Sequence, residues 1–369
     1  MHRYPDRRLS LVLPAMLVAL VAASCGASST PAPGSTAPSP SAAAAPSTAP
    51  SPSAAAPASS EPSAAATSPS PAATTIKVAL VAPSAVNDLA FTQSMVEAVN
   101  SLKGKYNLEI AVSDNQFVVA TAANVIQTYA TQGYNLIIAH GSQYGSTIQQ
   151  LAPKFPNVSF AWGTAGSTYD LPNVFAYQVN SNEGGYVQGA MAAMLSKSKV
   201  LGVIGPIAVG DAKLYVDGFC AGAKSVASSI SCIPVYTGSF SDVSLMSAAA
   251  TTFVANKADV LTGTAQAVVG AIGVAKTNNL PWFGTQWTQV SLAQSNVVSS
   301  QVYDWSPFVG EILTDIQGGK LGGTTFTATL ANGGAKIDFN PGFSLPAEVK
   351  AKADSLIKGI TDGSIKVPE

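Results

Sequence analysis

The sequence predicts an α/β fold of two Rossmann-like lobes, each with a parallel sheet, joined by a hinge. From residue 76 onward, short and nearly all-apolar strands alternate with amphipathic helices, and this alternation runs twice along the chain. Such strands are typical of parallel sheets covered by helices on both faces. Hydrophobic residues make up 47% of the 369 residues, which is enough to bury a sizeable core.

The first 25 residues have the features of an export signal. Arg3, Arg7 and Arg8 form a positive start, and residues 9–23 form an apolar run that is shorter than the roughly 20 residues of a membrane-spanning helix. The run ends in small residues before Cys25, which resembles the lipobox of bacterial lipoproteins. We therefore expect a lipid on Cys25 that anchors an extracytoplasmic protein to the cell membrane. The alternative is an ordinary cleaved signal with an incidental cysteine.

Residues 26–75 consist almost entirely of Ser, Ala, Pro, Thr and Gly. A segment of this composition has too little large apolar surface to offset the entropy of ordering it. Its prolines favour extended conformations. We predict a disordered linker that holds a folded body away from the membrane.

The first series of elements extends from residue 76 to about 180. Phe91, Met95, Val99 and Leu102 recur at helical spacing and mark one buried helix face. The predicted strands are residues 76–82, 108–112, 136–139, 158–162 and 174–177, and the predicted helices are 90–103, 117–132 and 145–153.

The second series begins with a helix directly after the first series ends. Its predicted helices are residues 183–196, 212–228, 243–256 and 265–278, and its predicted strands are 200–204, 233–236, 259–261 and 282–284. With chain crossovers near Asn180, Gly284 and Pro307, we expect residues 76–180 and about 285–306 to form lobe 1, and 181–284 and about 307–369 to form lobe 2.

Ligands of such folds bind beyond the carboxyl ends of the parallel strands. The loops that follow the predicted strands are therefore the candidate binding loops. They are residues 83–90, 114–117, 140–145, 205–214, 237–242, 263–266 and 285–289.

Several segments at these loops occur in an order that resembles the basic membrane protein family, a group of type I solute-binding lipoproteins of ABC transporters. They are residues 87–94 (NDLAFTQS), 183–190 (EGGYVQGA), 200–205 (VLGVIG), 217–223 (DGFCAGA), 236–242 (YTGSFSD) and 283–289 (FGTQWTQ). The resemblance implies two lobes that close on a small ligand and an ABC permease and ATPase as partners.

Members of this family often bind purine nucleosides. The resemblance implies that Asp88 hydrogen-bonds the ligand and that Phe91 stacks on a base, with Thr92 where the family has Asn. Three positions depart from the family pattern. An acidic residue is replaced near Ser146, the ribose-binding Asp is replaced by Gln286, and the expected Lys falls near Val302 or Tyr303.

A neutral ligand is best held by aromatic faces and a few aimed polar groups. Each aromatic candidate could instead pack in the core, Asp88 could cap a helix, and His140 could be a structural histidine. Besides the residues named above, the candidate ligand-binding residues are His140, Tyr144, Tyr215, Gly263, Trp287 and Tyr303.

Other classes of function find little support. Cys220 and Cys232 could form a disulfide in an oxidising compartment or remain buried thiols. The net charge of −1 lacks the basic footprint of a nucleic-acid binder. No metal cluster, paired-carboxylate signature, phosphate-binding loop or nucleophile elbow is visible, so we expect no cofactor, no metal and no catalysis.

The sequence therefore predicts a lipid-anchored solute-binding protein of an ABC importer that holds a small neutral ligand, a nucleoside or similar, between its lobes. We expect it to be a monomer. One alternative is a receptor subunit that presents the ligand to a signalling partner. A second is an extracellular enzyme acting on nucleosides or sugars, in which His140 would have to serve as the base.

Overall fold

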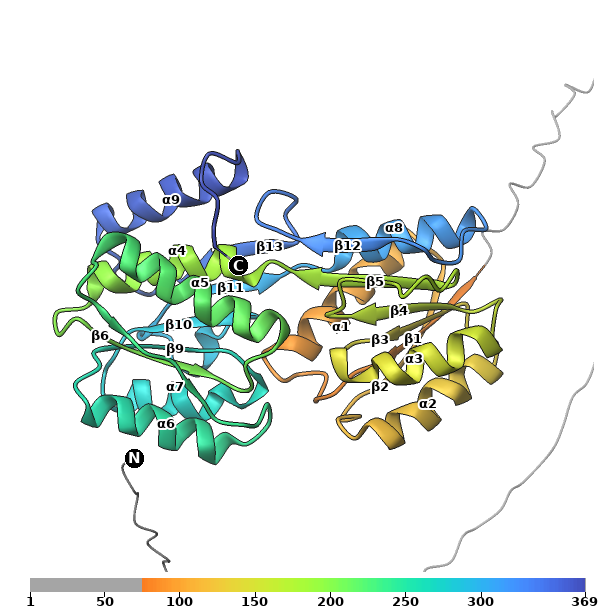
Figure 1. Ribbon diagram of the computed structural model, residues 1–369, viewed down its shortest axis with the longest axis horizontal. Coiled ribbons are helices and arrows are strands. Elements are labelled where there is room, and N and C mark those ends of the chain that lie inside the picture. The colour runs from red at the N-terminus through yellow and green to blue at the C-terminus, as the bar shows by residue number, and fades with distance from the viewer. Residues whose placement is uncertain (1–74, 369) are drawn as a thin grey trace, which may run out of the picture. The chain divides into compact units, whose positions relative to one another are not determined.

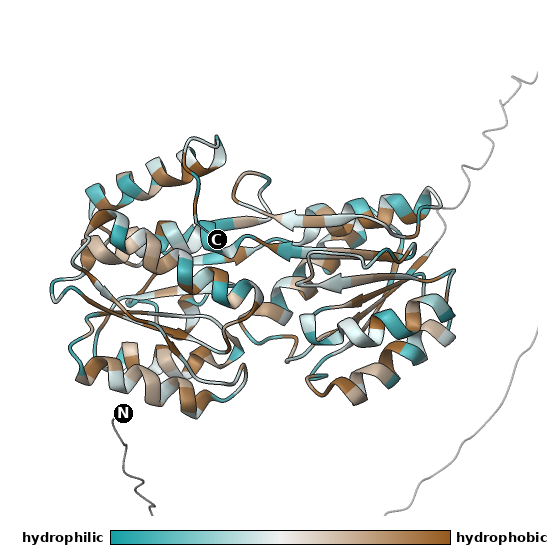
Figure 2. Cartoon of the chain, in the orientation of Figure 1, coloured by the Kyte–Doolittle hydropathy of each residue, from teal (hydrophilic) through white to brown (hydrophobic). Residues whose placement is uncertain are grey.

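The computed structural model describes residues 75–368, which form two α/β lobes (Figure 1). The predicted export signal, Cys25 and the predicted linker lie outside the described residues. The central strands of each lobe are largely apolar, whereas several strands nearer the sheet edges also carry polar residues (Figure 2). The helices pack apolar side chains against the sheets. This is the predicted fold of two Rossmann-like lobes, each built on a mainly parallel sheet.

The first lobe is built on a fully parallel six-stranded sheet in the order β12-β5-β4-β3-β1-β2. Helices α1 and α8 cover one face, and α2 and α3 cover the other. The elements are β1 (Ile76–Val81), α1 (Phe91–Ser101), β2 (Leu108–Ser113), α2 (Val119–Thr131), β3 (Leu136–Ala139), α3 (Gly145–Leu151), β4 (Ser159–Gly163), β5 (Val174–Val179), α8 (Ser306–Gln317) and β12 (Thr325–Ala328).

The second lobe holds a sheet in the order β13-β11-β10-β9-β6-β7, in which β8 also pairs with β6 and β13 runs antiparallel to β11. Helices α4, α5 and α9 cover one face, and α6 and α7 cover the other. The elements are α4 (Ser181–Leu195), β6 (Val200–Gly205), α5 (Gly210–Val226), β7 (Ser231–Cys232), β8 (Val235–Tyr236), α6 (Val243–Ala255), β9 (Val260–Gly263), α7 (Val269–Thr277), β10 (Trp282–Gln286), β11 (Val297–Tyr303), β13 (Ala335–Phe339) and α9 (Ala347–Thr361).

The predicted lobe boundaries are wrong after residue 284. Strands β10 and β11 continue the second sheet by parallel pairing, so residues 285–303 belong to lobe 2 and not to lobe 1. Helix α8 and strand β12 then return to the first lobe before β13 and α9 complete the second. The chain crosses between lobes at Asn180, as expected, just before Pro307, and again at residues 329–334, whereas Gly284 lies inside β10.

Backbone and side-chain hydrogen bonds hold these crossings next to one another. The backbone N–H of Asn180 donates to the Ala328 carbonyl at 2.9 Å, and that of Asp304 donates to the Gly334 carbonyl at 2.8 Å. The Glu183 carboxylate accepts from the backbone N–H of Leu330 at 2.7 Å. Three chain segments that lie side by side form the connection about which the lobes could turn.

The glycine-rich segments of the sequence bring helices α4 and α5 together. A Cβ on Gly189 would overlap the carbonyl of Phe219, and one on Gly222 would overlap the carbonyl of Tyr186. Glycine is therefore required for this close helix approach. The glycine-rich segments of α4 and α5 therefore serve the packing of these two helices in lobe 2.

Cys220 and Cys232 form a disulfide that ties α5 to β7, which settles the alternative between a disulfide and buried thiols. Short 3-10 turns complete the described elements at Leu102–Gly104, Ser142–Tyr144, Ala152–Lys154, Gln266–Val268 and Val290–Leu292.

Candidate functional site

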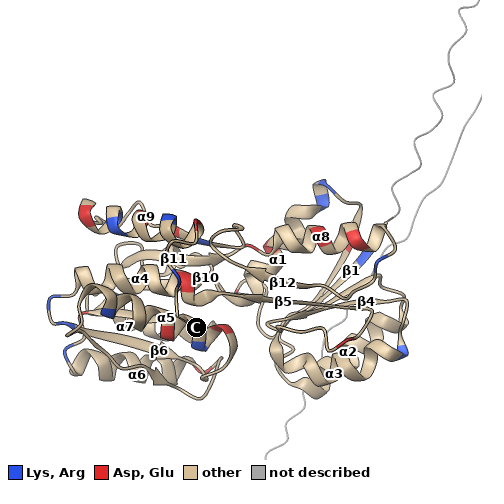
Figure 3. Cartoon of the chain, turned by 45° about the horizontal axis from the view of Figure 1, so that its top comes forward, with Lys and Arg blue, Asp and Glu red and all other residues tan. Residues whose placement is uncertain are grey.

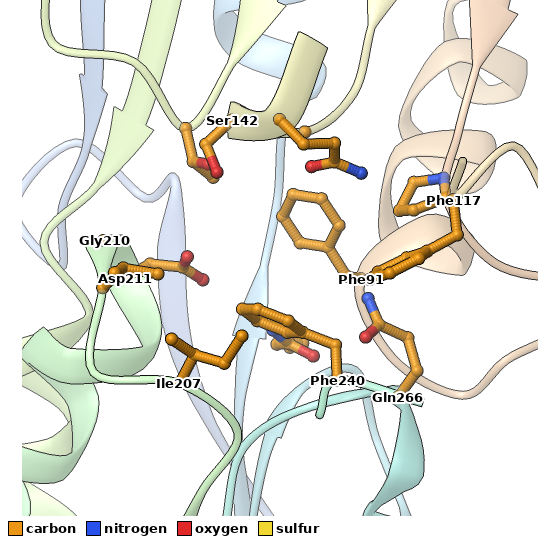
Figure 4. Close-up of a pocket in the computed structure, with 14 residues that line it drawn as sticks. Phe91, Phe117, Ser142, Ile207, Gly210, Asp211, Phe240 and Gln266 are labelled. Carbon is orange, nitrogen blue, oxygen red and sulfur yellow. The ribbon is translucent and has the colours of Figure 1, made fainter. Parts of the chain in front are cut away.

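A cavity of about 230 Å³ lies between the carboxyl ends of the two sheets. Side chains from both lobes converge on it, with Phe91 on one side, Asp211 opposite and Phe240 below in the view of Figure 4. Its size suits a small molecule rather than a chain of linked units. The lining residues are Pro83, Phe91, Phe117, Gly141, Ser142, Gln143 and Thr164 from lobe 1, and Ile207, Val209, Gly210, Asp211, Phe240, Gln266 and Gln286 from lobe 2.

Each of the predicted binding loops contributes at least one residue to the lining of this cavity. This follows from the parallel sheets, since the carboxyl ends of their strands meet at one edge. Thr164, in the loop after β4, and Phe91, at the start of α1, lie outside the predicted loops. The loop contributions are Pro83, Phe117, residues 141–143, Ile207, residues 209–211, Phe240, Gln266 and Gln286.

Phe91 forms an aromatic platform that is held from behind by other rings. Its ring stacks on His140 with centroids 3.7 Å apart and planes 9° apart. Trp305 meets the edges of both Phe91 and His140. Only 6% of Phe91 is exposed. The ring therefore presents one face to the cavity while the other is fixed by packing.

His140 is structural, which is one of the two roles considered for it. Its Nε2 lies 3.0 Å from the Phe91 carbonyl, which can only accept, so Nε2 carries the proton and Nδ1 accepts from the Tyr177 hydroxyl at 2.7 Å. Burial lowers the pKa of His140 to about 3, so the ring is neutral at physiological pH. It is fully buried and does not line the cavity.

The wall supplied by lobe 2 combines apolar side chains with three polar ones, Asp211, Gln266 and Gln286. Asp211, in the first turn of α5, points its carboxylate at the cavity (Figure 4), with the Tyr303 hydroxyl 3.5 Å from its Oδ2. Burial raises the pKa of Asp211 to about 6, although hydrogen bonds from Gln286 and Tyr303 partly offset this shift. Gln286 is 4% exposed and has φ of 72°, a left-handed backbone that non-glycine residues rarely adopt.

Asp88 and Thr92 stabilise the start of α1 and do not line the cavity. The Asp88 carboxylate accepts from the backbone N–H groups of Ala90, Thr92 and Gln93 at 2.9–3.1 Å. It also accepts from the Ser84 hydroxyl at 2.6 Å, and that hydroxyl pairs with Thr92. These contacts match the helix-capping role considered for Asp88.

Four further candidates lie away from the cavity. Tyr144 is buried and donates to the Gln116 carbonyl at 2.8 Å, while Ser146 is exposed on α3. Tyr215 is buried in lobe 2 and donates to Gln188 at 2.7 Å. Gly263 packs against Ile204 inside the sheet. Gln143 and Gln266 line the cavity from the same two loops as Tyr144 and Gly263.

Trp287 and Tyr303 line a different cavity, of about 330 Å³, between α1 and the end of β11. The polypeptide turns outward at Gln286, which directs the next side chain away from the space between the sheet ends. Tyr303 nevertheless reaches toward the first cavity through its contact with Asp211. Of the candidates named from the sequence, Phe91 and Gln286 line the cavity between the sheets directly.

Sequence reasoning missed Asp211, Phe117, Phe240 and Gln266 as individual residues, although their loops were identified. All four lie in predicted binding loops, and Phe240 also lies within the YTGSFSD segment. For Phe117, Phe240 and Asp211, the sequence signal that could have identified a lining residue was an apolar or acidic side chain within a loop that follows a strand.

Charged residues are sparse over the described surface (Figure 3), and none of the cavity-lining residues is Lys or Arg. Within residues 75–368, no three His, Cys, Asp or Glu side chains cluster where they could hold a metal ion. In the same residues, every helix is too short or too polar to cross a bilayer.

Comparison with known proteins agrees with this geometry. Residues 75–369 match the family model for PnrA-like ABC transporter substrate-binding proteins, named Bmp. The chain is 29% identical to the nucleoside-binding ABC transporter protein BmpA of Lactococcus lactis over 80% of this chain and 90% of the relative. It is 28% identical to a purine-binding protein of Brucella abortus over 64% of this chain and 67% of the relative.

A solved solute-binding protein of an ABC transporter system from Conexibacter woesei has the same fold. Its TM-score is 0.66 at 24% identity, over 79% of this chain and 98% of that chain. Substrate-binding proteins of ABC transporters act outside the cytoplasm and bind solutes without converting them, so the enzyme alternative is set aside. The chain belongs to the Bmp family of PnrA-like ABC transporter substrate-binding proteins.

Proposed function

We propose that this protein is the lipid-anchored, solute-binding subunit of an ABC importer and that it binds a small neutral ligand, a nucleoside or similar, in the cavity between its lobes. The observation that carries the proposal is the cavity itself, which is lined by strand-end loops of both sheets. An ABC permease and ATPase would receive the ligand. The relatives that bind nucleosides and purines support this class of ligand.

The chemistry of the lining suits a molecule with a flat ring and polar substituents. Phe91, Phe117 and Phe240 offer ring faces, and stacking of a base on an aromatic side chain contributes about 1–3 kcal/mol. Ser142, Gln143 and Gln286 offer neutral hydrogen-bonding groups. The absence of Lys and Arg from the lining disfavours phosphorylated ligands.

Binding would draw the lobes together. A ligand that touches both Phe91 and Asp211 gains its full set of contacts only when the lobes are close, so it shifts the population toward the closed form. The adjacent crossings at Asn180, Asp304 and residues 329–334 would act as the hinge. The closed surface would then be the form that the permease recognises.

The first test is a thermal-shift screen of nucleosides, nucleobases, sugars and amino acids, because a ligand that binds only the folded state raises Tm. We expect nucleosides to give the largest shift. Ser142→Trp should abolish it by filling the cavity, whereas Ser146→Trp, at an exposed position outside the lining, should retain it. A shift that survives Ser142→Trp would place the ligand elsewhere.

The anchor is tested separately on Cys25. Metabolic labelling with a palmitate analogue should label the wild-type protein in the membrane fraction, and Cys25→Ala should lose both the label and the membrane association. Retention of the unlabelled Cys25→Ala protein in the membrane fraction would contradict a lipid anchor at this residue.

A further inference from the structure

Asp211 is the one ionisable side chain among the residues that line the cavity. It lies in the first turn of α5, and its carboxylate points toward the centre of the cavity (Figure 4). Within the described residues, Asp211 takes part in no ion pair, and Lys213 pairs instead with Asp217 on the exposed side of the same helix. A carboxylate is thus placed at the ligand position without a positive partner from the protein.

Two further side chains of lobe 2 have hydrogen-bond acceptors without a donor. Gln286 Oε1 is buried and has no hydrogen-bond partner, and the same holds for Gln266 Oε1. Both residues line the cavity from lobe 2. Buried acceptors are almost always paired in folded proteins, so unpaired acceptors at a cavity wall call for donors from a bound molecule.

The donors that the protein itself supplies do not meet this demand. The backbone N–H groups of Asp211 and Ala212 and the side chains of Gln286 and Tyr303 donate to the carboxylate, but burial is still the dominant influence on Asp211 and raises its pKa to about 6. Tyr303 stays neutral because burial raises its pKa well above the ordinary value. These donors therefore offset only part of the cost of burying the charged form of Asp211.

We propose that Asp211 determines ligand specificity by accepting hydrogen bonds from a donor group of the ligand, while Phe91 and Phe240 take the ligand's ring. This inference rests on the proposed function and adds the chemistry of the bound end. A pair of hydroxyls on a sugar supplies such donors within a neutral ligand. A protonated amine would supply them too, but it would replace the neutral ligand class of the proposed function with a cationic one. An anionic group at this end would meet the carboxylate and two carbonyl oxygens and be repelled.

The test is isothermal titration calorimetry at pH 7.5 with the wild-type protein, Asp211→Asn and Asp217→Asn. The last variant removes a carboxylate from the exposed side of the same helix and serves as the matched control. The probes are inosine, 2′,3′-dideoxyinosine, inosine 5′-monophosphate and phenethylamine. Inosine and dideoxyinosine share a ring and differ in the hydroxyl pair, and phenethylamine carries a ring and a cation.

We expect Asp211→Asn to weaken binding of the preferred probe at least tenfold and Asp217→Asn to change it less than twofold. A loss seen with inosine but not with dideoxyinosine assigns the donor to the hydroxyl pair. A loss shared by both assigns it to the ring, and a loss confined to phenethylamine assigns it to an amine. Each of these outcomes supports Asp211 as the acceptor.

Unchanged binding of the preferred probe by Asp211→Asn overturns the inference and leaves the proposed function intact. Tighter binding of the monophosphate than of inosine by the wild-type protein also overturns it. If the wild-type protein binds none of the probes, the proposed function fails and the inference fails with it. Because Asp211→Asn should fold at least as stably as the wild type, weaker binding would not reflect unfolding.

Discussion

Phe91 and Asp211 face the same cavity but are held there by different physical means. Phe91 is fixed by a stack on neutral His140 and by the edge of Trp305, so its position changes little with pH. Asp211 is held in the first turn of a helix with a carboxylate that burial disfavours. The Phe91 side of the site is therefore held by close packing, whereas the Asp211 side carries a carboxylate whose charged form is disfavoured by burial.

This charge should make the ligand-free protein less stable at neutral pH. The pKa of Asp211 is about 6 in the folded protein against 3.8 in the unfolded chain, so its contribution to stability is present at low pH and lost as pH rises through about 6. Asp211→Asn should raise the free energy of unfolding at pH 7.5 by about 1–2 kcal/mol, after allowance for partial exposure.

Urea denaturation of the ligand-free wild type and Asp211→Asn at pH 7.5 and pH 4 measures this difference. We expect the gain to shrink at the lower pH, where the wild-type carboxyl is protonated. Asp217→Asn, at an exposed ion pair, should show no gain. A ligand-free Asp211→Asn protein that is less stable than the wild type at pH 7.5 would show that the carboxylate has a structural role.

Among the elements, α4 and α5 depend on glycine for their close contact. Gly189→Ala should destabilise the protein by about 3 kcal/mol, since the added methyl group would overlap the Phe219 carbonyl backbone. Gly273→Ala is the matched control, because Gly273 is exposed on α7 and a Cβ added there would meet open space. The control should be neutral or slightly stabilising. Equal denaturation midpoints for the two variants would contradict the close packing.

The disulfide between α5 and β7 is the second feature at this scale. It joins residues 12 positions apart, and loss of such a crosslink typically costs about 2–4 kcal/mol. The Cys220→Ala/Cys232→Ala variant should therefore unfold at lower denaturant concentration than the oxidised wild type. Neither cysteine lines the cavity, so its ligand affinity should be unchanged. Equal stability of the oxidised and reduced wild type would contradict this prediction.

The sequence predicted well those elements whose hydrophobic residues follow a strand or helix pattern within the element itself. The apolar strands and amphipathic helices up to β10 were identified except for the two-residue strand β7, and their order placed the binding loops. Strand β11 was missed because buried Ser299, Ser300 and Gln301 interrupt its apolar run. Short β12 and β13 depend on pairing with distant strands, so the crossing at residues 329–334 was missed. The crossing near Pro307 was predicted, but a further crossing was wrongly placed at Gly284.

Side-chain direction was harder to predict than loop position. Tyr144 and Tyr215 lie in predicted cavity loops or next to them, yet their rings turn into the core and their hydroxyls bond Gln116 and Gln188. Trp287 follows a residue with a left-handed backbone and so points to another cavity. These directions depend on contacts between elements, which no local pattern in one sequence reports.

In the whole folded region, apolar side chains at the edges of both lobes face the cavity between the sheets. Phe117 is 48% exposed on lobe 1 and Val209 is 48% exposed on lobe 2, and both line the cavity. Closure would remove this apolar surface from water and so favour the liganded form. Trp305, which touches Phe91 and Tyr303, is the tryptophan best placed to report binding by fluorescence, in place of Trp287.

Small-angle X-ray scattering of the purified protein, with and without the nucleoside that gives the largest thermal shift, tests the central claim most directly. A saturating ligand should decrease the radius of gyration of the wild type and leave that of Ser142→Trp unchanged, because a filled cavity cannot take the ligand that draws the lobes together. An unchanged radius of gyration for wild-type protein that calorimetry shows to be saturated would contradict closure around an interlobe ligand.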